Sequence, residues 1–228
     1  MNACAQAALS LPPLLAAGET RLSAEQIYPR LFDAILEQRL PPGSPLPEQA
    51  LGDAFGVSRT VIRRVLGRLS DQHVVVQRPS HTAHLAAPDP QQARQILSAR
   101  RLGEITLIDL ATQRSRPAQI RQLRQLVERE RQHHEQGQRC AAIRLGGEFH
   151  LKLAQIANNA PLTRFLNGLV PMTSLIIARY ESHTCDHCAW QEHAAIIDAV
   201  EDGDGDVARS LMHQHLDRLE AKLELALD

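Results

Sequence analysis

The chain has 228 residues, a hydrophobic content of 43% and a formal net charge of −1 at pH 7, which is enough chain for one large domain or two small ones. Because the net charge is close to zero, a surface that binds nucleic acid must be a local patch of basic residues. No apolar run reaches the roughly 18 residues of a membrane span, so we predict a cytoplasmic protein without membrane contact.

Residues 1–20 are predicted to form a loose extension. Pro12 and Pro13 interrupt its mildly apolar stretch and no Lys or Arg precedes it, so it lacks the features of a signal peptide. The chain has four cysteines, of which Cys185 and Cys188 form a C-x-x-C pair. A single pair of this kind is weak evidence for a zinc site, and we expect reduced thiols.

Residues 21–87 combine short helical patterns with a brief β-like segment. Ser23 and Gln26 have the spacing of a capping box at the start of a first helix. Pro29 fits badly inside a helix, so the regular part of this helix is expected to begin near Tyr28.

A helix-turn-helix followed by a hairpin is predicted next. A helix over 47–55 leads to a turn at Gly56, and Ser58 is a strong N-cap candidate for a third helix over 58–70. Two β-like runs follow, at 74–76 and 84–86. This order of elements is that of a winged helix-turn-helix, a DNA-binding fold.

The polar face of the third predicted helix is basic and carries no acidic residue. Arg59, Thr60 and Arg63 lie in its N-terminal half, which enters the major groove in such motifs. Arg can bind guanine through two hydrogen bonds, and the Thr methyl group can pack on thymine. Alone, a basic helix face is more often a solvated surface. The order of the elements and the hairpin favour double-stranded operator DNA as the partner.

Two segments, 40–48 (LPPGSPLPE) and 55–63 (FGVSRTVIR), resemble the DNA-binding domain of the GntR family of bacterial repressors. The resemblance covers nearly all of residues 24–86. It implies that the third helix contacts operator bases and backbone and that the wing tip approaches the minor groove. We therefore predict DNA contacts from Ser58, Arg59, Thr60, Arg63, Arg68, Gln49 and His81.

Three positions depart from the pattern of that family. Gln49 stands where Arg is often found, and Arg64 stands where Glu is usual. His81 and Thr82 occupy the place of a basic residue followed by Gly. Because Thr resists the positive φ angle that Gly permits, this departure bears on the shape of the wing.

Residues 88–228 carry an almost continuous helical pattern after a linker marked by Pro88 and Pro90. Six helices are predicted, over 89–113, 117–136, 139–157, 161–181, 187–202 and 205–226. Such a series makes an antiparallel all-helical bundle, so the chain as a whole is predicted to be mainly α.

Three of the 11 histidines have apolar neighbours one turn away and are predicted to point into the bundle: His150, His193 and His215. His213, by contrast, has charged neighbours one turn away on each side and is predicted to face water. One inward histidine is usually a core residue. Three from three helices favour a divalent metal, zinc or nickel, with open positions left for water or a carboxylate.

The C-terminal region resembles the FCD domain of the FadR-type GntR subfamily, on the segments 148–150 (EFH), 192–193 (EH) and 212–216 (MHQHL). Metal-binding members of that family use three histidines that match His150, His193 and His215. They add an Asp one turn before the first, where this chain has Gly146. A water, the carboxylate of an effector, or Asp109 could complete the shell.

The same resemblance suggests residues that bind an effector. Arg100 matches an Arg that often faces the effector, with Arg101 as the alternative, and Asn159 matches an Asn after the first His motif. We predict a homodimeric regulator whose operator binding responds to a small carboxylate. A metal-dependent hydrolase that uses the three histidines, and a structural dimer with three core histidines and no metal, are the alternatives.

Overall fold

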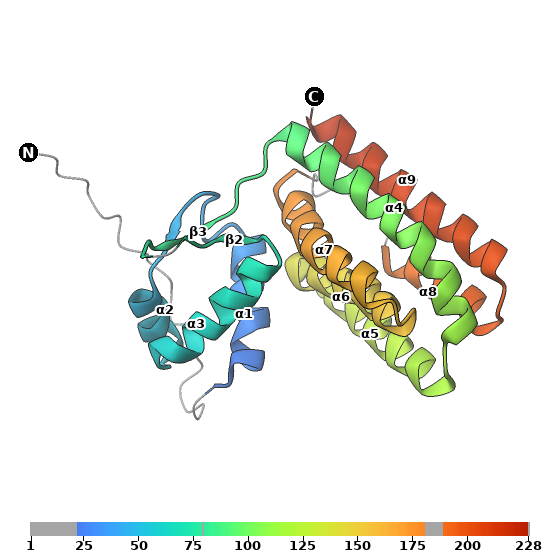
Figure 1. Cartoon of the computed structure of the whole chain (residues 1–228), viewed down its shortest axis with the longest axis horizontal. Helices are drawn as coiled ribbons and strands as arrows, with labels where there is room; N and C mark the ends of the chain where they lie inside the picture. The colour runs from blue at the N-terminus through green and yellow to red at the C-terminus, as the bar shows by residue number, and fades with distance from the viewer. Residues whose placement is uncertain (1–21, 79, 181–188, 228) are drawn as a thin grey trace, which may run out of the picture. The chain divides into compact units, whose positions relative to one another are not determined.

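The computed structural model describes residues 22–78, 80–180 and 189–227, in two compact units (Figure 1). Of the described residues, one unit comprises those up to Ser70 together with Val75–Ala87, and the other comprises Asp71–Val74 and those from Pro88 onward. The predicted extension over 1–20 and the C-x-x-C pair lie outside the described residues.

The first unit contains the predicted helices as α1 (Ala24–Leu36), α2 (Glu48–Phe55) and α3 (Arg59–Asp71). Gly56 ends α2 with a left-handed φ of 62°, which makes the turn into α3. The prediction that regular helix begins near Tyr28 is wrong, because α1 continues through Pro29. The buried face of α1, to which Ile27 and Leu31 belong, spans the proline, and its packing outweighs the backbone hydrogen bond lost there.

A three-stranded antiparallel sheet completes this unit, with β1 (Pro45–Leu46), β2 (Val75–Val76) and β3 (Ala83–Leu85) in the order β1-β3-β2. The pairing of β2 with β3 is the predicted wing. Strand β1 was not predicted, because two residues are too few to display an alternating pattern. In the described part of the wing Ser80 takes the positive φ angle, 61°, and Thr82 does not, so the strain expected at Thr82 does not arise.

The second unit is a bundle of helices that match the six predicted ones, each end within two residues. They are α4 (Pro90–Arg114), α5 (Pro117–Glu135), α6 (Arg139–Ile156), α7 (Ala160–Tyr180), α8 (Ala189–Glu201) and α9 (Gly205–Leu227). The mainly α fold class is therefore confirmed. None of the helices in the described ranges is long and apolar enough to cross a membrane.

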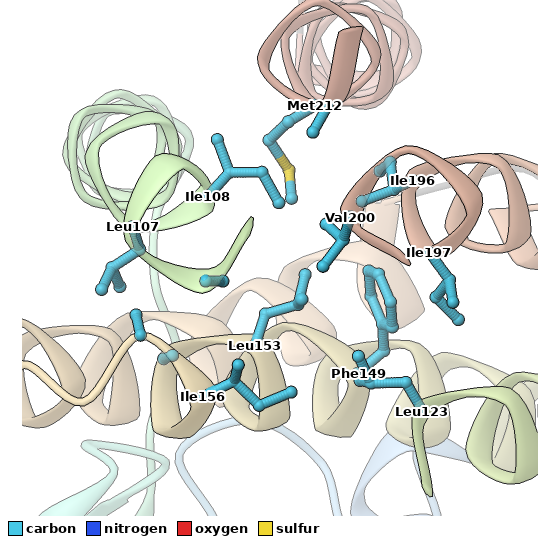
Figure 2. Packing of buried hydrophobic residues seen from close by; sticks show 14 of the residues in the cluster. Leu107, Ile108, Leu123, Phe149, Leu153, Ile156, Ile196, Ile197, Val200 and Met212 are labelled. Carbon is cyan, nitrogen blue, oxygen red and sulfur yellow. The ribbon is translucent and has the colours of Figure 1, made fainter. Parts of the chain in front are cut away.

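The core of the bundle joins all six helices, α4 to α9, around Phe149 and Leu153 (Figure 2). Ile196, Ile197 and Met212 reach the same cluster from α8 and α9. The Phe149 ring also stacks on the imidazole of His193, with ring centroids 4.3 Å apart. The packed core thus fixes the relative positions of the helices that carry the inward histidines.

Candidate functional site

The three predicted inward histidines converge in the bundle. His150 of α6, His193 of α8 and His215 of α9 are each at most 6% exposed. One ring nitrogen from each lies within 4.8 Å of the corresponding atoms of the other two. Their ring centroids are 4.8–5.1 Å apart. The geometry therefore brings three imidazoles to one point, as the sequence pattern predicts.

Each imidazole has a glutamate on its Nδ1 side. The pairs are His150 with Glu104 at 2.7 Å, His193 with Glu130 at 2.8 Å, and His215 with Glu192 at 2.6 Å. The last two contacts are hydrogen bonds, whereas the first has the distance of one but not its direction. A carboxylate at Nδ1 places the ring proton there and leaves the Nε2 lone pair available.

Burial holds the imidazoles of His150 and His215 in the neutral form. Burial sets the pKa of His150 well below its ordinary value, and burial also lowers the pKa of His215. Burial alone would raise the pKa of the Glu104 carboxyl, but Arg100 and His150 outweigh it and hold that pKa well below the usual range. Arg100 Nε donates a hydrogen bond of 2.6 Å to Glu104 Oε1. The neutral imidazole is the form that binds metal ions.

Glu192 is likewise ionised. Burial would raise its pKa, but hydrogen bonds from His215 and Arg218 outweigh burial and lower the pKa to about 2. Arg218 Nη1 lies 2.7 Å from Glu192 Oε1. Sequence reasoning did not identify Glu104 or Glu130 as part of the site, because each lies in a helix segment whose pattern gives no sign of its partner.

A cavity of about 360 Å³ adjoins the three histidines. Four cationic side chains line it: Arg100, Arg139, Arg218 and Lys222. Apolar side chains that include Ile143, Ile177 and Leu219 line it as well. Trp190 also contributes to the lining, and its Nε1 is buried without a hydrogen-bond partner among the described residues. The size and the cationic lining suit a small organic anion.

The winged-helix unit has a second concave surface, which we call the basic groove. Gln49 of α2, Arg59 and Arg63 of α3, and His81 of the wing all line it. Four of the seven predicted DNA-contact residues thus share one surface. Ser58 and Thr60 are exposed at the start of α3 but do not line the groove.

An acidic residue that sequence reasoning did not assign holds the two arginines of the groove. Glu48, the first residue of α2, accepts hydrogen bonds of 3.0 and 2.8 Å from Arg63. Arg59 Nη2 lies 3.6 Å from the same carboxylate. The bond from Arg63 is the main cause of a lowered pKa at Glu48. The signal was available, because Glu48 ends the first family-like segment.

Two family profiles match consecutive parts of the chain. Residues 23–83 match the family described as bacterial regulatory proteins, gntR family, and residues 95–218 match the FCD domain. The protein belongs to the GntR family and carries an FCD domain.

Known regulators resemble this GntR protein along most of its length. The Uxu operon regulator of Haemophilus influenzae is 28% identical over 200 residues, which cover 79% of this chain and 74% of the relative. The transcriptional repressor RspR of Escherichia coli K12 is 26% identical, with 86% of each chain covered. The structure of E. coli McbR/YncC superimposes with a TM-score of 0.72 at 18% identity, over 92% of this chain and all of that one. The families and relatives are transcription regulators, which leaves the hydrolase alternative without support.

Of the residues predicted to bind an effector in this GntR protein, some line the cavity and others do not. Arg100 lines the cavity, whereas Arg101 forms ion pairs with Asp217 and Glu220. Asn159 is not part of the cavity lining, and its Oδ1 accepts a hydrogen bond of 3.3 Å from the backbone of Leu162 at the start of α7.

Two further side chains are occupied elsewhere. The suggestion that Asp109 completes the metal shell is wrong, because Asp109 pairs with Arg209 at 2.8 Å. Asp109 lies five residues beyond Glu104, about 140° further round α4. The guanidinium of Arg68 lies 3.6 Å above the ring of Tyr28 and so packs within the winged-helix unit.

Proposed function

We propose that this regulator binds operator DNA as a homodimer and that a small carboxylate in the FCD cavity controls that binding. The observation that carries the proposal is the cluster of three buried histidines beside a cavity lined by four cationic side chains. A carboxylate effector would gain charge-assisted hydrogen bonds there. The regulator would act in the cytoplasm, where its DNA lies.

The residues of the cluster fit a divalent metal ion. Nε2 of His193 is buried and has no hydrogen-bond partner among the described residues, so it is an acceptor that lacks a ligand. Three imidazoles, each with a carboxylate at Nδ1, are a donor set typical of zinc and nickel. His150, His193 and His215 would hold the ion, which would offer an open position to an oxygen of the effector.

The protein residues around this position would orient the effector. Arg100 reaches the cavity from α4, and Arg218 reaches it from α9, where Glu192 holds its guanidinium. Ile143 and Ile177 give the cavity an apolar side that excludes water. We therefore assign Arg100 to effector binding and leave Asn159 out of the site, since its side chain caps α7.

An apolar surface of the bundle supports the dimer. Leu102 on α4 is 71% exposed and Phe165 on α7 is 46% exposed. The Phe165 ring lies against Gly103, the residue that follows Leu102 in α4. Large apolar side chains exposed on a bundle can mark protein contacts. In a dimer, two α3 helices would read two half-sites, and a bound effector would shift their spacing.

The test combines effector binding with DNA binding on the full chain. Purified protein is loaded with zinc or nickel, and a panel of small mono- and dicarboxylates is screened by thermal shift. Any carboxylate that stabilises the protein is then added to a gel-shift assay with a DNA fragment selected from a random pool. We expect a carboxylate that raises the melting temperature to change the DNA affinity, and Arg100→Ala to abolish both effects. Carboxylates that stabilise the protein but leave DNA binding unchanged would refute the coupling.

A further inference from the structure

Glu130 is a buried carboxylate on a helix whose neighbouring positions face water. It is 3% exposed, whereas Glu128 and Arg129 on the same turn of α5 are exposed. Its Oε2 accepts a hydrogen bond of 2.8 Å from Nδ1 of His193, and the side chain reaches the cavity. Because burial of a carboxylate is unfavourable unless it is paired, the position of Glu130 calls for a partner that offsets the lost hydration.

Gly146 of α6 provides the space that Glu130 occupies. A Cβ atom built on Gly146 would lie 3.0 Å from Oε1 of Glu130 and 3.3 Å from Cε1 of His193. Both distances are tighter than ordinary contacts, so an alanine here would push on the carboxylate and on the imidazole. Glycine in the middle of a helix is less favourable than alanine. The absence of a side chain at Gly146 thus leaves room for the Glu130 carboxylate from α5.

We propose that Gly146 and Glu130 form one unit that positions the His193 imidazole for metal binding. Glu130 enters through the gap in α6 and binds Nδ1 of His193, which turns Nε2 of that ring toward the other two histidines. This inference rests on the metal site proposed above and adds a positioning residue to it. The space beside His193 takes one carboxylate, so an acid from α5 and a side chain at position 146 exclude each other.

The first test measures zinc affinity of the full chain by competition with a chromophoric chelator, and the visible spectrum of bound cobalt. Glu130→Gln keeps the shape of the side chain but removes its charge, and Gly146→Ala adds a methyl group without removing any donor. We expect each to weaken zinc binding about 10- to 100-fold and to alter the cobalt spectrum. The matched control is Glu128→Gln, an exposed position on α5, which should bind zinc like the wild type.

A relocation experiment separates positioning from general damage to the fold. In Gly146→Asp the new Cβ would lie 3.0 Å from the present position of Glu130 Oε1. Once Glu130 is shortened to alanine, the Asp carboxylate can occupy that space from α6 instead. We expect Glu130→Ala and Gly146→Asp each to weaken zinc binding and the double variant to regain most of it. Circular dichroism of the metal-free proteins shows whether each variant is folded.

The outcomes distinguish this inference from the proposal on which it rests. If the wild type binds neither zinc nor nickel, the metal site and this inference both fail. If the wild type binds zinc and folded Glu130→Gln and Gly146→Ala bind it equally well, only the role of Glu130 and Gly146 is refuted. A double variant that recovers no affinity would refute the claim that one carboxylate site is shared between α5 and α6.

Discussion

Replacing His215 with alanine removes one of three donors, and His213 on the same helix is the matched control. His215 is buried in the cluster, whereas His213 is exposed. When free zinc is held at 100 times its dissociation constant, binding stabilises the folded protein by about 2.7 kcal/mol. For a domain of this size, that raises the melting temperature by about 5–10 °C.

The His215→Ala variant should lose most of this stabilisation. If two remaining imidazoles bind zinc 100-fold more weakly, the stabilisation at the same free zinc falls to about 0.4 kcal/mol, or about 1 °C. His213→Ala should keep the full shift. The assay is differential scanning fluorimetry in a zinc buffer, with each variant referred to its own melting temperature in chelator and its metal content checked by elemental analysis. Equal loss in the two variants would refute the site, and so would a wild type without a shift.

Three further predictions concern DNA, pH and assembly. Arg63→Ala should weaken binding to a selected operator about 10- to 100-fold and weaken binding to random DNA less. The control is Arg64→Ala, because Arg64 does not line the basic groove. An equal loss on both DNAs would mean that Arg63 contacts only phosphate. Burial lowers the pKa values of His150 and His215, so protonation favours the unfolded chain. The stability of the metal-free protein, measured by urea denaturation, should therefore be full above pH about 6.5 and fall below it. A stability that rises from pH 7 to 5.5 would contradict this prediction. Leu102→Glu should halve the mass measured by light scattering, whereas Val207→Glu, at another exposed position, should not. A wild type that is already monomeric would refute the proposed dimer.

Local periodicity was sufficient to predict most of the fold. Helix ends and the inward direction of the histidines depend on spacing along one helix, which the sequence displays directly. The capping residue Asp89, whose side chain accepts a hydrogen bond from Gln92, also marks the start of α4 locally. Strand β1 escaped prediction because its identity depends on pairing with β3, where Leu46 pairs with Ala83, 37 positions further along the chain.

The parts of the site that the sequence did not predict depend on contacts between helices. Glu130 lies in a run of charged residues that is typical of a solvated face, and only the packing of α5 against α6 and α8 places it beside His193. Asp109 was suggested because its neighbours in the chain are apolar, but the carboxylate that α4 presents to His150 is that of Glu104. Which acid on a helix faces a histidine on another is fixed by the rotation of both helices.

The buried histidines and carboxylates cost desolvation free energy at the centre of the bundle, which argues against a purely structural role. Three imidazoles and three carboxylates lie where apolar side chains of similar volume would pack without desolvation. Nε2 of His193 lacks a partner among the described residues, and a buried polar atom left in that state costs about 1–3 kcal/mol. A ligand that binds these nitrogens removes this destabilisation, but only while it is bound. The stability of the bundle then depends on the ligand, and that dependence is what a sensing domain requires.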